Sequence, residues 1–168
     1  MAVQLTYEDN MQVTMPGMRS DSSLQNTDGG NAAQTAIKPG YVVARVSIAL
    51  DKRVVKQVSA AGDAVNLMGI ARFSQTGCVT GQYEIGDAVN VMTFGRIWAV
   101  TTLTAAPTMG TIVNVLTSGA DAGKVAATGG SQAAGWVFTG KFTDFINNAG
   151  ATVHLAEVQI RNQTAPAA

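Results

Sequence analysis

The chain has 168 residues, which is long enough for one apolar core. Its 11 basic and 11 acidic side chains balance, so it has no net charge to steer it toward nucleic acid. No run of 18 apolar residues predicts a transmembrane helix, the N-terminus lacks the pattern of a signal peptide, and the single cysteine, Cys78, excludes an internal disulfide. Val outnumbers Leu by 19 to 7, and 18 Gly are scattered along the chain, which predicts an all-β protein rich in turns.

Residues 1–38 carry isolated apolar side chains between polar residues and turn dipeptides such as Pro16-Gly17. Nothing in this segment has the density to build its own core. A disordered tail and an extended arm lying along a neighbouring subunit both fit the pattern, and we favour the arm. Its anchors, the predicted interface residues, are Leu5, Tyr7, Met11, Val13, Met15 and Met18.

From Pro39 onward the pattern is one of short apolar runs, each closed by a turn. The strands expected in chain order are 41–50, 53–58, 65–73, a short one at 78–83, 88–94, 96–103, 111–116, 124–127, 134–139 and 151–160. Residues 141–148 fit one turn of helix or a hairpin loop. Turn signals every 8 to 12 residues are typical of a small β-barrel or β-sandwich. The sequence therefore predicts an arm at 1–38, a body at 39–161 and a flexible tail at 162–168.

One pentapeptide, Gly-Asp-Ala-Val-Asn, occurs at 62–66 and again at 86–90, each time before an apolar run. We interpret both copies as a turn that leads into a strand. Two copies are too few for a solenoid, but their spacing suits two hairpin units of one barrel.

Residues that could carry chemistry are few and isolated. A lone histidine, His154, lies in an expected strand, where Glu157 would point to the opposite face. Cys78 has no base or cation in its motif to activate it. The acidic residues lack metal-ligand spacing, and no glycine-rich stretch has the ending of a phosphate loop. The sequence predicts no catalytic, cofactor or metal residue, no small-molecule substrate and no enzyme activity.

Two further groups of residues favour contact surfaces or packing over ligand binding. The basic cluster of Arg45, Lys52, Arg53 and Lys56 stands in a neutral chain, which favours a solvated or interface face over nucleic-acid binding. An exposed tryptophan can bind carbohydrate, but core or subunit-interface packing is the favoured role of Trp98 and Trp136, which join the predicted interface set.

The order of motifs in residues 39–160 resembles the capsid decoration and structural cement proteins of tailed phages. The motifs are Pro39-Gly40-Tyr41, Met68-Gly69-Ile70-Ala71, Ile85-Gly86-Asp87-Ala88-Val89, Gly95-Arg96-Ile97-Trp98 and Ala134-Gly135-Trp136-Val137-Phe138.

The resemblance implies a small β-barrel or sandwich that binds the outer surface of the major capsid protein shell and stabilises the head. It also implies assembly in the host cytoplasm into a virion, as a homotrimer or, in the alternative, a dimer. A tail-tube or baseplate protein, or a carbohydrate-binding module, are the competing interpretations. A tube protein would polymerise alone.

Overall fold

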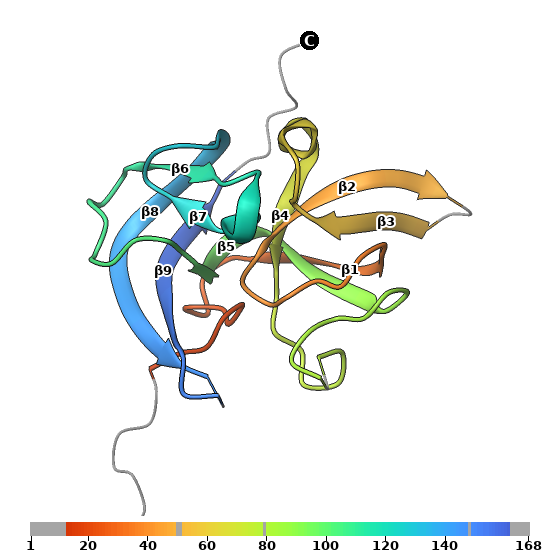
Figure 1. The fold of residues 1–168 in the computed structure, drawn as a ribbon, viewed down its shortest axis with the longest axis horizontal. Helices are drawn as coiled ribbons and strands as arrows, with labels where there is room; N and C mark the ends of the chain where they lie inside the picture. The colour runs from red at the N-terminus through yellow and green to blue at the C-terminus, as the bar shows by residue number, and fades with distance from the viewer. Residues whose placement is uncertain (1–12, 50–51, 79, 148, 162–168) are drawn as a thin grey trace, which may run out of the picture.

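The computed structural model describes residues 13–49, 52–78, 80–147 and 149–161. These residues form strands with two short 3₁₀ helices (Figure 1), so the prediction of an all-β fold is confirmed. The strands are β1 (Asn26–Ala33), β2 (Val42–Ala49), β3 (Lys52–Gln57), β4 (Leu67–Ala71), β5 (Ala88–Val100), β6 (Ile112–Val115), β7 (Val125–Ala126), β8 (Ser131–Ile146) and β9 (Thr152–Ile160), and the 3₁₀ helices are η1 (Ala61–Asn66) and η2 (Gly119–Asp121). In this described part of the chain, no helix is long and apolar enough to cross a membrane.

Five of the strands close into a small barrel. Their order is β1-β3-β2-β4-β5, and an additional pairing of β1 with β5 completes the circle. All of these pairs are antiparallel except β1 with β3. One apolar cluster gathers side chains of these strands and of the loops beside them, with Ile37 and Tyr83 fully buried. Closure leaves the barrel wall without an open edge along the paired stretches, which removes a route to unwanted strand pairing.

The long strand β5 belongs to two sheets. Its first half pairs with β1 and β4 of the barrel, whereas residues from Gly95 to Val100 pair with β9. Gly95 has φ +117, a conformation that suits glycine, at the point where the strand leaves one sheet for the other. The second sheet, called the C-terminal sheet, has the order β5-β9-β8-β6-β7. An isolated bridge from Thr101 to Val125 brings the end of β5 back to β7.

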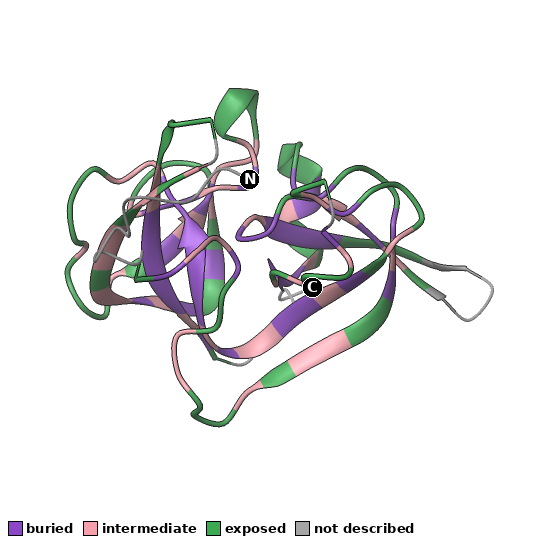
Figure 2. Cartoon of the chain, turned by 90° about the horizontal axis from the view of Figure 1, so that it is seen from below, coloured by how far each residue is buried: buried purple, intermediate pink, exposed green. Residues whose placement is uncertain are grey.

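The largest core cluster lies on the inner face of the C-terminal sheet, which packs against the barrel. It joins Val42, Ile70 and Met92 of the barrel strands to Trp136 and Phe138 of β8. Figure 2 shows buried residues along strands in both halves of the molecule. Because this cluster draws on both sheets, it packs the barrel against the C-terminal sheet, while the barrel has a cluster of its own.

The body begins earlier than the expected boundary at residue 39. Strand β1, with the sequence Asn-Thr-Asp-Gly-Gly-Asn-Ala-Ala, lies inside the segment expected to be an arm. Its backbone pairs with β5 on one side and β3 on the other, and Ile37 is fully buried. The described part of that segment, 13–38, is therefore built into the body. Residues 1–12 and the expected tail at 162–168 lie outside the described residues.

Three other expectations differ in detail. At the short strand expected at 78–83, the described residues 78 and 80–83 form no strand, and an isolated bridge joins Tyr83 to Ile37. The strands expected at 88–94 and 96–103 are one strand, β5, which ends at Val100. Residues 141–146 are neither a helical turn nor a loop, because β8 continues through them to Ile146.

Candidate docking surface

A segment near the N-terminus covers the edge of β5 that β9 leaves open. Within residues 13–20, called the strap, Gly17 to Ser20 run antiparallel to β5, with Arg19 bridged to Ile97. The backbone N–H of Gly17 donates to the carbonyl of Trp98 at 2.9 Å, and the N–H of Trp98 donates back to Met18 at 2.9 Å. These residues thus act as one more strand beside β5, next to Trp98, which is 7% exposed.

Gly17 is the point where the strap meets the barrel. Its carbonyl accepts the N–H of Phe73 at 2.9 Å, so residue 17 links β5 to the segment that follows β4. A Cβ at this position would lie 2.7 Å from the carbonyl oxygen of Ala71 and 2.8 Å from the nitrogen of Gly40. Gly17 also has φ +75. Only glycine therefore fits this crossing of backbones without strain.

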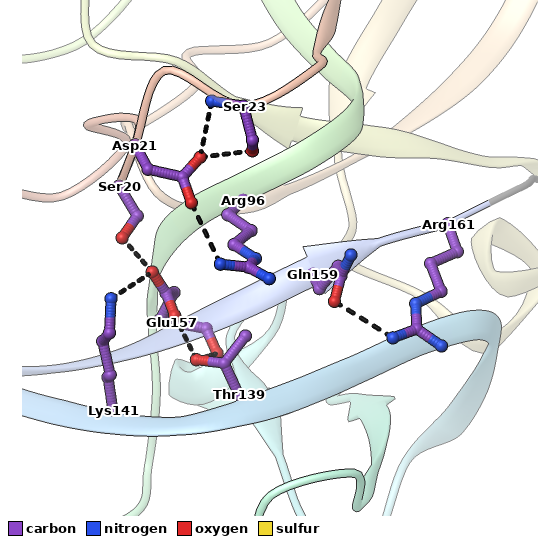
Figure 3. A network of polar contacts seen from close by, with 9 residues as sticks. All are labelled: Ser20, Asp21, Ser23, Arg96, Thr139, Lys141, Glu157, Gln159 and Arg161. Atoms are coloured by element: carbon purple, nitrogen blue, oxygen red, sulfur yellow. Dashed lines mark hydrogen bonds and ion pairs between the residues drawn. The ribbon is translucent and has the colours of Figure 1, made fainter.

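A buried carboxylate fixes the strap to the outer face of the C-terminal sheet, the face turned away from the barrel. Glu157 of β9 is fully buried, and its carboxylate accepts hydrogen bonds from the hydroxyls of Ser20 and Thr139. The ammonium of Lys141 lies 3.2 Å away and supplies the counter-charge. Figure 3 shows Ser20 of the strap and Thr139 and Lys141 of β8 converging on Glu157 of β9. Burial of a charge is tolerated here because it is both paired and hydrogen-bonded.

The rest of the outer face is a row of side chains that crosses four strands. Ile112 pairs with Val137, Val137 with Gln159, and Gln159 with Arg96, and directly paired residues share a face. Arg96 is ion-paired with Asp21 at 3.0 Å. The pKa of the Asp21 carboxyl is lowered, first by the hydrogen bonds from Ser23 and then by the charge of Arg96.

This face and the segments beside it also present an arginine and exposed apolar side chains. Arg161 donates to the amide oxygen of Gln159 at 3.1 Å and has no carboxylate partner within the described residues. Three large apolar side chains are exposed in the elements that form or flank this sheet, namely Met18 of the strap at 45%, Ile112 of β6 at 45% and Met109, which precedes β6, at 79%. Met and Arg are among the residue types enriched at protein interfaces, so this face is a candidate docking surface.

The predicted interface residues fall into three groups. Leu5, Tyr7 and Met11 lie outside the described residues. Val13 and Met18 are exposed, whereas Met15 is half-buried on the strap. Trp98 and Trp136 are buried within the subunit, Trp136 to 1% exposed in the shared core, so neither ring offers surface to a partner or a sugar in this structure.

The network around Glu157 was missed from the sequence, although one signal was present. Glu157 stands in β9 among four apolar residues that are all buried, namely Leu155, Ala156, Val158 and Ile160. A carboxylate among buried neighbours calls for partners, but those partners come from segments far away in the chain. Ser20 is separated from Glu157 by 137 residues.

The two residues singled out for reactivity have different surroundings. His154 has a carboxylate partner that the sequence did not reveal. Its Nδ1 lies 2.7 Å from the carboxylate of Asp144 on the paired strand β8, and its ring stacks on Phe142. Cys78 is buried beside the barrel core, and burial raises the pKa of its thiol, which disfavours the thiolate. Among the residues that the structure describes, no three His, Cys, Asp or Glu gather as metal ligands.

Two of the four members of the predicted basic cluster have carboxylate partners in the structure, and the side chain of Lys52 lies outside the described residues. Arg53 is ion-paired with Asp28 and Lys56 with Asp63, each at 2.6 Å, while Arg45 is exposed. Burial tends to raise the pKa of Asp63, but the bond to Lys56 and two backbone N–H groups outweigh it and hold that pKa below its usual range.

Comparison with known proteins identifies a family. The model of a phage cement family described as "Structural cement protein (E217 gp24/Pam3 gp6)" matches residues 3–161. A comparison with curated proteins gives no match. Among solved structures, a chain from "The capsid of Myoviridae Phage XM1" has a TM-score of 0.69 and 20% identity, covering 95% of this chain and 98% of that one. The likeness extends over both the barrel and the C-terminal sheet, and with the family match over nearly the whole sequence it establishes that this chain belongs to the phage structural cement protein family.

Proposed function

We propose that this chain decorates the outer surface of a phage capsid and cements its shell, and that it resides in the virion. The observation that carries the proposal is the family match over residues 3–161. The fold supports it, because the solved chain with the same architecture comes from a phage capsid. A tail-tube or baseplate role has no comparable support.

The proposed partner is the major capsid protein of the shell. A specific interface of standard size buries about 1,600 Å² in total, and many copies acting on one shell give avidity beyond that of a single contact. The exposed apolar residues supply candidate contacts on this side of the interface. Leu5, Tyr7 and Met11, together with Val13, Met15 and Met18, remain the proposed anchors of the N-terminal segment.

We further propose that the protein acts without catalysis and as a homo-oligomer, with a trimer favoured and a dimer as the alternative. In support, the family is one of structural virion proteins. A weakly charged surface, with 13% charged residues in the chain, also suits a protein that is largely covered in its assembly.

The direct test adds the purified protein to capsids that lack it. Cosedimentation with expanded capsids and a raised temperature of capsid disruption are the expected results. Bovine serum albumin at the same concentration is the control for nonspecific trapping. Protein that stays in the supernatant, or that polymerises into tubes by itself, would contradict the proposal.

A further inference from the structure

The last part of β8 has a strand on one side only. On the β6 side, the backbone contacts end at Phe138, whose carbonyl accepts the N–H of Gly110 at 2.8 Å. Among the described strands, β9 is the one that pairs with residues 142–146, which are called the terminal edge. Figure 1 shows β8 running well past β6 at the rim of the molecule.

The pairing of β8 with β9 determines which backbone groups of the terminal edge point outward. The carbonyl of His154 accepts the N–H of Thr101 at 3.0 Å, so the backbone of His154 faces β5 and not β8. His154 pairs with Asp144, and in an antiparallel ladder such a non-hydrogen-bonded pair alternates with hydrogen-bonded ones. The N–H and C=O groups of Asp144, and of Phe142 two residues earlier, therefore point away from β9. Within the described part of the chain, these four groups have no hydrogen-bond partner.

The groups beside the terminal edge suit an extended polypeptide. Outward N–H and C=O groups at every second residue are matched by the backbone of an added strand, which is how many domains bind peptides. Exposed apolar side chains lie at both ends of the edge, because Ile146 is 56% exposed and Met109 is 79% exposed. Met109 lies beside β8, since a Cβ at Gly140 would be 3.5 Å from its Cβ. Backbone groups supply hydrogen bonds at this edge, and the apolar side chains supply contact area.

A second copy of this chain is a poor occupant of the terminal edge. If two copies paired through residues 142–146 about a two-fold axis, Asp144 of one would stand directly opposite Asp144 of the other. Like charges directly opposite each other destabilise a strand pair. The nearest register toward the start of the edge that still aligns the outward groups pairs only residues 142–144 with one another. Charge and length therefore favour a strand of different sequence.

We propose that an extended segment of the major capsid protein adds as a strand to the terminal edge of β8. This inference rests on the proposed function, and it identifies where the shell contacts this protein. The added strand bonds to the outward N–H and C=O groups of Phe142 and Asp144, and its side chains contact Met109 and Ile146. Binding also covers a strand edge that would otherwise be open to unwanted pairing.

Hydrogen–deuterium exchange of the full chain, free and bound to capsids, tests this contact residue by residue. The amides of Phe142 and Asp144 should exchange fast in the free protein and at least about tenfold more slowly on capsids. The amides of Thr143 and Phe145, which face β9, should be protected in both states and are the internal control. Unchanged exchange at Phe142 and Asp144 on capsids would overturn the proposal. Slower exchange without capsids, increasing with protein concentration, would instead identify a second copy as the occupant and also overturn it.

Two substitutions at one position separate the backbone group from the side chain. Asp144→Pro removes both the carboxylate and the outward N–H, whereas the matched control Asp144→Ala removes the carboxylate alone. Proline is tolerated at a strand edge where its missing N–H would face outward, and circular dichroism checks that both variants fold. Asp144→Pro should raise the dissociation constant for capsids by on the order of tenfold, and Asp144→Ala by less than about threefold.

Equal capsid affinities of two folded variants would contradict the added strand. If Asp144→Pro does not fold, the exchange measurement on the unaltered chain decides the matter. Capsid binding of the unaltered chain is scored separately. If that chain binds capsids while exchange at the terminal edge stays fast, the inference alone fails, whereas absence of binding overturns the proposed function.

Discussion

The hydroxyl of Ser20 donates a hydrogen bond to the buried carboxylate of Glu157, which joins the start of the described chain to its last strand. The same carboxylate accepts from Thr139 and pairs with Lys141. One side chain thus holds three segments together on the outer face of the C-terminal sheet.

The first prediction concerns this carboxylate. Glu157→Ala should lower the free energy of unfolding by about 2–3 kcal/mol, because it leaves two hydroxyls and an ammonium without their acceptor. Ser20→Ala should cost about 1 kcal/mol, since Thr139 and Lys141 still satisfy the acid. Urea denaturation checks both values. Asp144→Ala, at an exposed pair with His154, is the control and should cost less than either. Equal losses for Glu157→Ala and Asp144→Ala would contradict the role given to burial.

The second prediction concerns the crossing at Gly17. Gly17→Ala should destabilise through both a left-handed backbone and a clash with backbone atoms of Gly40, Ala71 and Phe73. Gly81→Ala is the matched control, because Gly81 has φ +86 but open space around its Cβ position. The control should cost about 1–2 kcal/mol and the Gly17 variant at least about 1 kcal/mol more. Thermal unfolding measures the difference between the two variants. Equal melting midpoints for Gly17→Ala and Gly81→Ala would show that the strap shifts to accept the added methyl group without loss of stability.

The third prediction separates the two parts of the N-terminal segment. Deletion of residues 1–12 should leave the cooperative unfolding of the body unchanged while weakening cosedimentation with capsids, because Leu5, Tyr7 and Met11 are among the proposed anchors. Deletion of 1–38 should abolish cooperative unfolding, because it removes β1 from the closed barrel together with Ile37 and the strap. Circular dichroism and denaturant titration distinguish these outcomes. A stable, cooperative product of the longer deletion would mean that the barrel can close without β1.

Much of the body could be predicted from the sequence, because its strands bury alternating or continuous apolar residues. β2 and β9 were expected within a residue or two of their bounds for this reason. β1 could not be found in this way, since Asn, Asp and Gly are poor strand formers and its place depends on backbone pairing with β3 and β5. Strand type in such a segment is decided by its neighbours in space.

The repeated pentapeptide shows the same limit. The copy at 62–66 forms most of η1, where Gly62 lacks a positive φ, whereas in the copy at 86–90 Gly86 has φ +91 and Ala88 begins β5. Five identical residues therefore take two conformations. The carboxylates differ as well, because Asp63 pairs with Lys56 and Asp87 accepts the N–H of Glu84. The conformation of each copy is therefore decided by its contacts with the rest of the fold and not by the five residues alone.

The last prediction follows from Asp63, whose carboxylate contacts Lys56 at 2.6 Å and the N–H groups of Ser59 and Ala60 at 3.0 Å. These contacts outweigh burial and lower the pKa of Asp63 in the folded protein. A lowered folded-state pKa contributes stability that is present above the unfolded pKa, about 3.9, and is lost as the pH falls through the folded value.

Asp63→Asn should therefore cost about 1 kcal/mol or more near neutral pH, and the difference from the unaltered chain should shrink as the pH falls below about 4. Asp121→Asn, which removes an exposed pair with Lys124, is the control and should change stability by less than about 0.5 kcal/mol at every pH. Urea midpoints measured from neutral to acidic pH decide the matter. A constant difference between Asp63→Asn and the unaltered chain across that range would show that the ionised carboxylate is not what holds the turn before η1.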